Sequence, residues 1–357
     1  MRDEKKQPAR WMIYGANGFT GKLVAEEAAR RGLKPVLAGR DAEKISAIAN
    51  SLQLEHRCFN LGSEEEIGTQ IKDIDTVLHC AGPFSATAKP MIDACIKTST
   101  NYLDITGEIA TFALAQSLDN QAKAAGCVLI PGVGFDIVAT DCLAAKLAER
   151  INQPDTLELA FCGEGGISPG TAKTMIEMLP EGGKIRRNGV IETVPSAFIR
   201  KNIAFSGKQA WCMSIPWGDI HTAYFTTGIP NITVYTATPR LTTYLMRLCS
   251  PLMTVFHSQK LQNHVKKLIE QKLQGPNQST MDSGYTLLWG KVSNRQGDSA
   301  ECLLNVAEGY KFTVASSLAC VEKVVEKKNL APGYHTPGSA FGADFILDIE
   351  TSRYIER

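Results

Sequence analysis

The sequence contains no uninterrupted apolar run of about 18 residues, the shortest stretch that crosses a bilayer as a helix. It also has no excess of charge of one sign, because 38 Lys and Arg stand against 37 Asp and Glu. The chain as a whole therefore has no field that attracts nucleic acid. Residues 1–15 hold no apolar segment of the kind found in secretory signals, which predicts a cytoplasmic protein. We expect a small-molecule or acyl substrate, no nucleic acid and no membrane span, and leave a homodimer open.

Motifs of several enzyme classes are also missing. The ten cysteines form no Cys-x-x-C pair and no close group with histidine, so we expect buried free thiols and no metal site. The Tyr-x-x-x-Lys pair of short-chain dehydrogenases does not occur. Neither does a Gly-x-Ser-x-Gly elbow, a His-Glu-x-x-His motif or a Walker loop. Hydrolase and metalloenzyme functions are disfavoured.

The chain of 357 residues is longer than one hydrophobic core usually supports, which favours two domains. Over residues 1–150, short apolar runs alternate with segments of helical period, as in a doubly wound parallel α/β sheet of the Rossmann type. Strands are predicted at 11–14, 35–38, 56–59, 76–80, 101–105 and 127–131. Helices are predicted at 21–31, 42–52, 64–71, 89–97 and 112–125.

Residues 151–310 show a different pattern of apolar segments, which predicts a second α+β domain for substrate binding or dimerisation. Its strands are expected at 156–162, 190–194, 223–227, 232–237, 286–292 and 300–306, with a hairpin turn at 295–298. Its helices are expected at 171–179, 240–257 and 259–273. The apolar side of 240–257 favours core packing or a dimer surface over membrane contact. Residues 311–357 are expected to form helices that return to the first domain.

The strongest chemical signal is the run Gly15-Ala16-Asn17-Gly18-Phe19-Thr20-Gly21, between the first strand and the first helix. Its glycines permit a tight turn, a close approach of backbone to pyrophosphate and close helix packing. The start of the helix offers N–H donors to the anion. We therefore predict a dinucleotide site that includes Gly15, Asn17, Gly18, Phe19, Thr20 and Gly21. The alternative is a turn of the same fold that binds no dinucleotide.

The end of the second strand distinguishes between the two pyridine dinucleotides. An Asp or Glu there favours NAD, but this strand ends in Ala38-Gly39-Arg40. The Arg40 guanidinium can grip a 2′-phosphate, and Lys44 can add charge, so NADP is favoured and NAD less so. Alternatively, Arg40 pairs with Asp41 or Glu43, or Asp41 itself meets a ribose.

The fourth strand is followed by small residues where a cofactor crosses the edge of such a sheet. Ala81, Gly82 and Pro83 are therefore predicted to contact the cofactor, and the loops at 106–108 and 132–136 to surround its nicotinamide. His79, inside the strand, is interpreted as a core histidine rather than a catalyst.

Hydride transfer also needs a proton donor close to the nicotinamide. By position the candidates are Tyr102, Asp104, Glu108 and Asp136, with Glu108 and Asp136 preferred. The structural alternatives are a core role for Tyr102 and helix capping for the acids. Two further candidates are the helix start at 168–173, with Lys173, which could receive an anion or be an ordinary capped helix, and His335, which could be a donor or a surface residue.

Taken together, these motifs resemble the saccharopine dehydrogenase-like oxidoreductases, in the branch that includes the trans-acting enoyl reductases. The resemblance implies an NAD(P)-binding domain, a separate substrate domain, and oxidation or reduction of a small or lipid-like substrate. It spans most of the chain and is densest over about the first 140 residues. It rests on segments 15–21, 38–40, 80–84, 94–108, 132–136, 170–172 and 336–342, together with Asp141.

The leading hypothesis is thus an NADP(H)-dependent oxidoreductase whose substrate the sequence does not name. A narrower alternative is a trans-acting enoyl reductase of a lipid or polyketide pathway. A third hypothesis, from a different class, is a redox sensor that binds NADP(H) without turnover, because the chain lacks a recognisable catalytic dyad.

Overall fold

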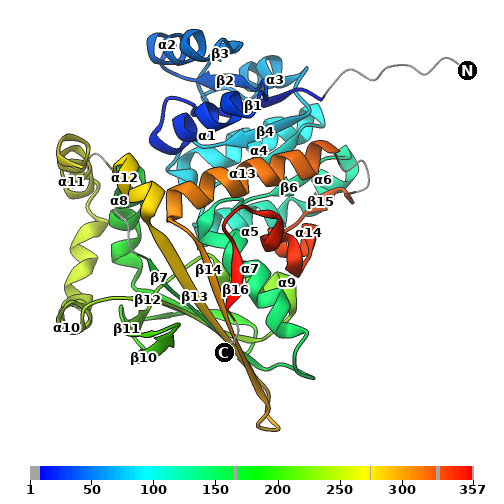
Figure 1. Ribbon diagram of the computed structural model, residues 1–357. Helices are drawn as coiled ribbons and strands as arrows, with labels where there is room; N and C mark the ends of the chain where they lie inside the picture. Colours follow the sequence, from blue (N-terminus) through cyan, green and yellow to red (C-terminus); the bar gives the residue numbers. More distant parts are fainter. Residues whose placement is uncertain (1–8, 164–166, 274, 327–329, 356–357) are drawn as a thin grey trace, which may run out of the picture. The chain divides into compact units, whose positions relative to one another are not determined.

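The computed structural model describes residues 9–163, 167–273, 275–326 and 330–355 (Figure 1). The chain divides into two compact units. Unit 1 comprises residues 1–105, 114–131 and 317–335, and unit 2 comprises 106–113, 132–316 and 336–357. The main boundary therefore lies near residue 131 and not at the expected 150. Of the C-terminal residues, 317–335 group with unit 1, but 336–357 group with unit 2.

Unit 1 contains a seven-stranded parallel sheet in the order β3-β2-β1-β4-β5-β6-β15 (Figure 1). The first six strands have the 3-2-1-4-5-6 order of a doubly wound dinucleotide-binding fold, which confirms the predicted fold class. All six predicted strands are present, and β15 adds a seventh at the edge. The strands are β1 (Trp11–Tyr14), β2 (Val36–Gly39), β3 (His56–Cys58), β4 (Thr76–His79), β5 (Asn101–Asp104), β6 (Val128–Ile130) and β15 (Gly333–Tyr334).

The helices of unit 1 follow the strands in βα alternation. The starts of α2 and α3 are set by the side chains of Asp41 and Ser63, which accept hydrogen bonds from N–H groups of the first turn. The predicted helix at 112–125 is two helices, α5 and α6, separated at Leu118. The elements are α1 (Phe19–Arg30), α2 (Ala42–Leu52), α3 (Glu64–Ile71), α4 (Phe84–Thr98) and α6 (Asp119–Ala125), with α5 (Ile109–Ser117) and α13 (Gly309–Glu326) divided between the two units.

Unit 2 contains a nine-stranded sheet in which β10-β11-β12-β7-β13-β14-β16 form the main path and β8 and β9 branch from β12. The pair β12–β7 is parallel and the other pairs are antiparallel, so the sheet is mixed, as expected for an α+β domain. The predicted hairpin at 295–298 joins β13 to β14 (Figure 1). The strands are β7 (Thr156–Gly163), β8 (Gly183–Arg187), β9 (Val190–Val194), β10 (Arg200–Phe205), β11 (Lys208–Ser214), β12 (Asn231–Ala237), β13 (Tyr285–Ser293), β14 (Ser299–Ala307) and β16 (Arg353–Ile355).

One strand prediction in unit 2 is wrong. Residues 223–227 are rich in aromatic and β-branched side chains, but they form the end of the helix α9 (Asp219–Thr227). Packing outweighs local propensity here, because α9 buries its first five residues and packs against α7. Gly228 then ends the helix in the left-handed conformation, with φ of 72°.

The remaining helices of unit 2 include two segments that replace the single helix predicted at 240–257. The α-helix α10 ends at Cys249, and a 3₁₀ helix, η2, begins with Ser250 and Pro251. The elements are α7 (Phe135–Ala148), α8 (Pro169–Met178), η1 (Leu179–Glu181), α10 (Arg240–Cys249), η2 (Ser250–His257), α11 (Gln259–Lys272), α12 (Gln278–Ser283), α14 (Pro337–Phe341) and η3 (Ala343–Asp348).

Core packing of the apolar side of 240–257 is also a wrong prediction. Leu241, Leu248 and Leu252 are between 71% and 77% exposed. All ten cysteines are free, as predicted, and eight of them are buried. Within the described ranges, none of the helices combines the length and apolarity that crossing a membrane requires.

Candidate functional site

The turn after β1 has room only for glycine. Gly15 has a φ of 87°, and its N–H donates to the carbonyl oxygen of Ala38 at 2.7 Å. A Cβ at Gly15 would lie 2.8 Å from the backbone nitrogen of Ala81. The predicted contact regions at 15–21 and 81–83 are therefore brought together, because the missing side chain lets the turn close onto the loop after β4.

The N-terminus of α1 is suited to binding an anion. Gly18 N–H donates to Gly15 C=O at 2.9 Å, and the helix begins at the next residue. No side chain caps this N-terminus, and its first turn contains no acidic residue. A Cβ at Gly21 would collide with the carbonyl oxygen of Gly15, so the third glycine lets the helix pack against the turn. Phosphate oxygens are natural partners for such a helix start.

Arg40 lies exposed directly after β2, where a 2′-phosphate would be recognised. The alternative pairing with Asp41 is not formed. The Asp41 carboxylate instead accepts the N–H of Lys44 at 3.1 Å. It also lies 3.0 Å from Lys44 Nζ, so the Lys44 ammonium group forms an ion pair with Asp41. Among the described residues, no carboxylate forms an ion pair with Arg40. The Asn17 Oδ1 lies over the end of β2, where a Cβ at Gly39 would be only 2.8 Å away.

The loop after β4 is supported by a neutral histidine. His79 is fully buried, and its Nε2 lies 3.0 Å from the Thr87 hydroxyl, which in turn lies 2.7 Å from the carbonyl oxygen of Ala81. Burial lowers the pKa of His79 to about 3, so the ring carries no charge at neutral pH. The predicted core role of this histidine agrees with its position. Gly82 at the tip of the loop is exposed.

Two candidates on β5 are in the core of unit 1. Tyr102 is completely buried, and its hydroxyl donates to Asp104 Oδ2 at 2.7 Å. Asp104 is also completely buried. This arrangement favours the structural alternative for Tyr102 over the role of proton donor.

Glu108 and Asp136 lie in unit 2. Glu108 is 8% exposed, its carbonyl oxygen accepts the N–H of Thr111 at 3.0 Å, and it occupies the start of α5. Asp136 is in the first turn of α7, and its Oδ2 rests against the bare Cα of Gly107, where a Cβ would be 2.7 Å away. The Trp217 indole donates to the carbonyl oxygen of Asp136 at 3.1 Å.

Asp136 has the protonation behaviour of an acid–base residue. The residue keeps partial exposure, but the desolvation of its carboxyl group raises the pKa to about 7. Both protonation states are therefore populated near neutral pH, as a residue that donates or accepts a proton requires.

Asp219 was not proposed as a site residue from the sequence, and Asp141 was used only as part of the family resemblance. Asp219, at the start of α9, is completely buried, and burial together with the charges of Asp141 and Asp136 raises its pKa well above the usual range. Asp141 accepts hydrogen bonds from Thr226 Oγ1 and Gly338 N, both at 2.7 Å, while burial raises its pKa. We call Asp136, Asp141 and Asp219 the carboxyl cluster. Asp219 was overlooked because residues 219–222 were assigned to no element and only 223–227 of α9 were assigned, as a strand, although an aspartate in an apolar segment is a usable signal.

His221, also on α9, was missed for the same reason. Its ring stacks on Phe112 with centroids 6.3 Å apart, and burial lowers its pKa to about 4. The imidazole is therefore neutral at physiological pH.

The remaining two predicted candidates have structural roles. Ser168 caps α8 by accepting the N–H of Thr171 at 3.2 Å, and Lys173 forms an ion pair with Glu270. This is the ordinary capped helix that was the alternative. The Nε2 of His335 lies 2.7 Å from the carbonyl oxygen of Ala331 within its own loop.

Comparison with known proteins agrees with these features. The family described as saccharopine dehydrogenase NADP binding domain matches residues 11–130. A human saccharopine dehydrogenase-like oxidoreductase is 31% identical over 204 residues, which covers 48% of this chain and 46% of that protein. A trans-acting enoyl reductase of Mycobacterium leprae is 31% identical over 156 residues, covering 42% of this chain and 37% of that protein. The chain thus spans less than half the length of these relatives.

A solved structure shares the fold along almost the whole chain. Saccharopine dehydrogenase (L-Glu forming) from Saccharomyces cerevisiae superposes with a TM-score of 0.68, covering 98% of this chain and all of that one, at 11% sequence identity. The resemblance drawn from the motifs is confirmed, and so is the prediction of NADP for the domain at residues 11–130.

Proposed function

We propose that this chain, whose residues 11–130 are a saccharopine dehydrogenase-type NADP-binding domain, is an NADP(H)-dependent oxidoreductase acting on a small or lipid-like substrate. The observation that carries the proposal is the N-terminus of α1, which has neither a capping side chain nor an acid, combined with the exposed cation of Arg40 at the end of β2. Together they offer N–H donors for a pyrophosphate and a guanidinium for a further phosphate.

Each part of the cofactor has a proposed set of residues. The backbone of Gly15, Gly18, Phe19 and Thr20 would hold the pyrophosphate, with Gly21 keeping the helix close. Arg40 would receive the 2′-phosphate through its planar fork, and Asn17 would lie beside it. Residues 81–83 would follow the cofactor toward its nicotinamide ring, which supplies or accepts the hydride when NADP(H) is bound.

Asp136 is the proposed proton donor for reduction. Its pKa near 7 leaves a substantial fraction protonated at neutral pH, so a carboxyl proton is available to the substrate atom that becomes negative as hydride arrives. Asp136 follows β6 in the chain by six residues, and ligands of parallel sheets bind beyond the carboxyl ends of the strands. Glu108, which follows β5, is the second candidate. We do not retain Tyr102, because its hydroxyl is buried and engaged by Asp104.

The narrower candidate is reduction of an enoyl group on a carried acyl chain. The trans-acting enoyl reductase relative from Mycobacterium leprae supports this candidate. The same residues would take part in this reaction. Hydride would be added to one carbon of the double bond, and Asp136 would donate a proton to the other carbon.

Turnover of NADPH with defined substrates tests the proposal. We expect NADPH fluorescence to decay with at least one member of a panel of enoyl thioesters, ketones and imines, and the decay to be lost in Asp136→Asn while NADPH binding is kept. Binding of NADPH without consumption across the panel would favour the redox sensor. Consumption of enoyl thioesters alone would establish the narrower candidate.

A cytosolic location is part of this proposal. The ten free thiols support it, because reducing compartments keep cysteines unpaired. Fractionation of cells expressing the tagged full chain tests it, and recovery from the secreted fraction would contradict it.

A further inference from the structure

A strip of large apolar side chains on α10 and η2 faces solvent. Its members recur every three or four residues, with one adjacent pair, so on a helix they fall on one face. Their exposed fractions range from 50% for Leu245 to 77% for Leu248. A contiguous exposed surface of this kind marks an interaction site in a folded protein. We call it the apolar strip, made of Leu241, Tyr244, Leu245, Leu248, Leu252 and Val255.

The opposite side of α10 is the side that packs on unit 2. Thr243 is completely buried, and its hydroxyl accepts a hydrogen bond from the Trp211 indole at 3.1 Å. The Arg240 guanidinium lies 4.5 Å from the centre of the Trp211 ring. The helix thus turns a polar residue inward and its leucines outward, the reverse of the usual amphipathic arrangement. This orientation is fixed by named contacts.

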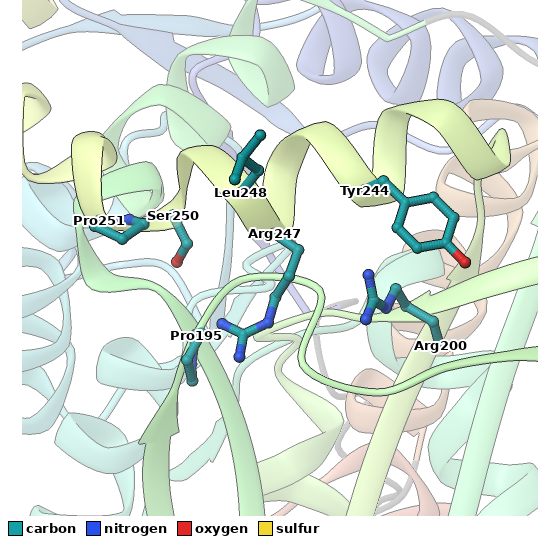
Figure 2. A pocket seen from close by; sticks show the side chains of 7 residues that line it. All are labelled: Pro195, Arg200, Tyr244, Arg247, Leu248, Ser250 and Pro251. Carbon is teal, nitrogen blue, oxygen red and sulfur yellow. The ribbon is translucent and has the colours of Figure 1, made fainter.

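A cationic groove adjoins the apolar strip. The groove is open, has a volume of about 660 Å³, and includes Arg200 and Arg247 (Figure 2). Figure 2 shows both guanidinium groups on the same side of α10, with the ring of Tyr244 next to Arg200, whose guanidinium carbon is 4.8 Å from the ring centre. In the part of the chain that the structure describes, no carboxylate forms an ion pair with either arginine. The lining is completed by Pro195, Leu248, Ser250 and Pro251.

The charge of the surrounding segment points to an anionic occupant. Residues 240–272 contain six basic residues and a single acidic one, Glu270, although the whole chain has a net charge of only +1. The same face of a second copy would bring these cations against their own equivalents, which opposes self-association. The basic residues are Arg240, Arg247, Lys260, Lys266, Lys267 and Lys272.

We propose that this face of unit 2 docks on an anionic phospholipid surface. The apolar strip enters the boundary between headgroups and acyl chains, and Arg200 and Arg247 receive lipid phosphates in the groove. A lipid surface fits better than an acidic protein, because exposed apolar side chains on two consecutive helical segments lie beside unpaired arginines of the described groove, the combination that an anionic headgroup boundary accepts. α10 is ten residues long and lies in the interface without spanning the membrane.

Vesicle co-sedimentation of the full chain tests the proposal. The probes are vesicles of phosphatidylcholine alone and of phosphatidylcholine mixed with phosphatidylserine. We expect binding to the anionic vesicles that weakens with added salt, and little binding to the neutral ones. The double variant Arg200→Gln/Arg247→Gln should bind about 30-fold more weakly, since each interfacial cation contributes roughly fivefold. Leu241→Ser/Leu248→Ser should lose at least about tenfold, because it removes inserted apolar surface.

Two matched variants control for surface chemistry elsewhere on unit 2. Leu347→Ser removes a leucine that is 50% exposed, and Arg353→Gln removes an exposed arginine, both outside the strip and groove. Both should bind anionic vesicles like the parent chain. All variants should keep the parent affinity for NADPH, which verifies that they are folded.

Several results would overturn the proposal. The first is a parent chain that stays in the supernatant with anionic vesicles while it binds NADPH. The second is equal vesicle binding by the parent and both double variants. Sedimentation velocity that shows a dimer dissociated by Leu241→Ser/Leu248→Ser would assign the strip to a second copy. Binding of purified acidic carrier protein without vesicle binding would assign it to a protein partner.

Discussion

The glycine turn of unit 1 and the carboxyl cluster of unit 2 differ in the chemical groups that form them. The turn is mostly backbone, its helix start has no acid, and the nearby Arg40 is exposed. The cluster consists of three carboxyl groups whose pKa values are raised by burial. The first arrangement is suited to holding an anion, and the second to holding protons. The difference supports the proposed cofactor site in unit 1 and the proposed acid–base role of Asp136 in unit 2.

The same contrast exists among the helices of unit 1. In α3, Ser63 caps the N-terminus and Glu64, Glu65 and Glu66 fill the first turn, so its dipole is compensated by the protein itself. α1 has none of these features, and α4 likewise has neither a side-chain cap nor an acid in its first turn. An uncapped helix start alone therefore does not mark a cofactor site, and the proposal for α1 rests on its combination with the glycine turn and Arg40.

The largest expected effect is the loss of NADPH binding when a side chain is added to the glycine turn. Gly15→Ala adds a Cβ 2.8 Å from the backbone of Ala81 and forces a residue with a side chain to a φ of 87°. We expect NADPH binding to fall below detection in fluorescence titration. Gly32→Ala is the control, because Gly32 has a φ of 75° but no neighbour within 4 Å of its Cβ position. NADPH binding by Gly15→Ala that equals that of the control would contradict the role of the turn.

The next effect concerns the carboxyl cluster. Asp136→Asn should lower kcat/KM for reduction by roughly 100- to 10,000-fold, because the amide has no proton to donate. NADPH affinity should not change. In the parent chain, kcat/KM for reduction should decrease as the pH rises through about 7, since only the protonated carboxyl group donates. A flat profile across this range would exclude Asp136 as the acid, and Glu108→Gln then becomes the variant to measure.

Stability offers a separate measurement of the same pKa. The carboxyl group of Asp136 titrates near 7 in the folded chain and near 3.8 when unfolded, so the folded state binds the additional proton between these values. The free energy of unfolding should therefore decrease as the pH rises from about 4 to 7. Asp136→Asn should lack this decrease and be about 2 kcal/mol more stable than the parent at pH 8, a value reduced for partial exposure. Urea unfolding at pH 5 and pH 8 measures the difference.

A smaller effect is expected at the end of β2. Arg40→Ala should weaken NADPH binding by about 2 kcal/mol, or roughly 30-fold, because a bidentate contact with the 2′-phosphate is lost. NADH binding should stay as it is. Lys44→Ala is the matched control, since its ammonium group already pairs with Asp41. Equal losses for both nucleotides would mean that Arg40 acts on something other than the 2′-phosphate.

The smallest effect separates structural caps from the functional helix start. Ser63→Ala should cost about 1 kcal/mol of stability in urea unfolding, because the N–H of Glu66 loses its acceptor. NADPH affinity should not change. Ser46→Ala, inside α2, should be nearly neutral for both quantities. A large drop in NADPH affinity for Ser63→Ala would contradict the division between the two kinds of helix start.

The sequence predicts unit 1 well because its signals are local. The predicted bounds of α2 and α3 agree with the structure at every residue, since Asp41 and Ser63 mark the starts and the apolar period is regular. The glycine turn and Arg40 were also recognised from neighbouring residues. Each of these features is decided within a few positions of the chain.

Unit 2 is less predictable because its structure depends on partners distant in the sequence. The antiparallel pair β10–β11 carries Lys201, Asn202 and Gln209 among its apolar residues, so no clear alternation marks it. The helix α9 contradicts its own β-propensity because α7 covers it. The cluster of Asp136, Asp141 and Asp219 joins two helices that are separated by about 80 residues, and no spacing rule connects them.

A calorimetric titration of the full chain with NADPH and NADH in parallel tests the central claim most directly. The backbone donors of α1 and the guanidinium of Arg40 predict saturable heat with NADPH and clearly weaker binding of NADH. No heat with either nucleotide, or NADH bound as tightly as NADPH, would contradict it.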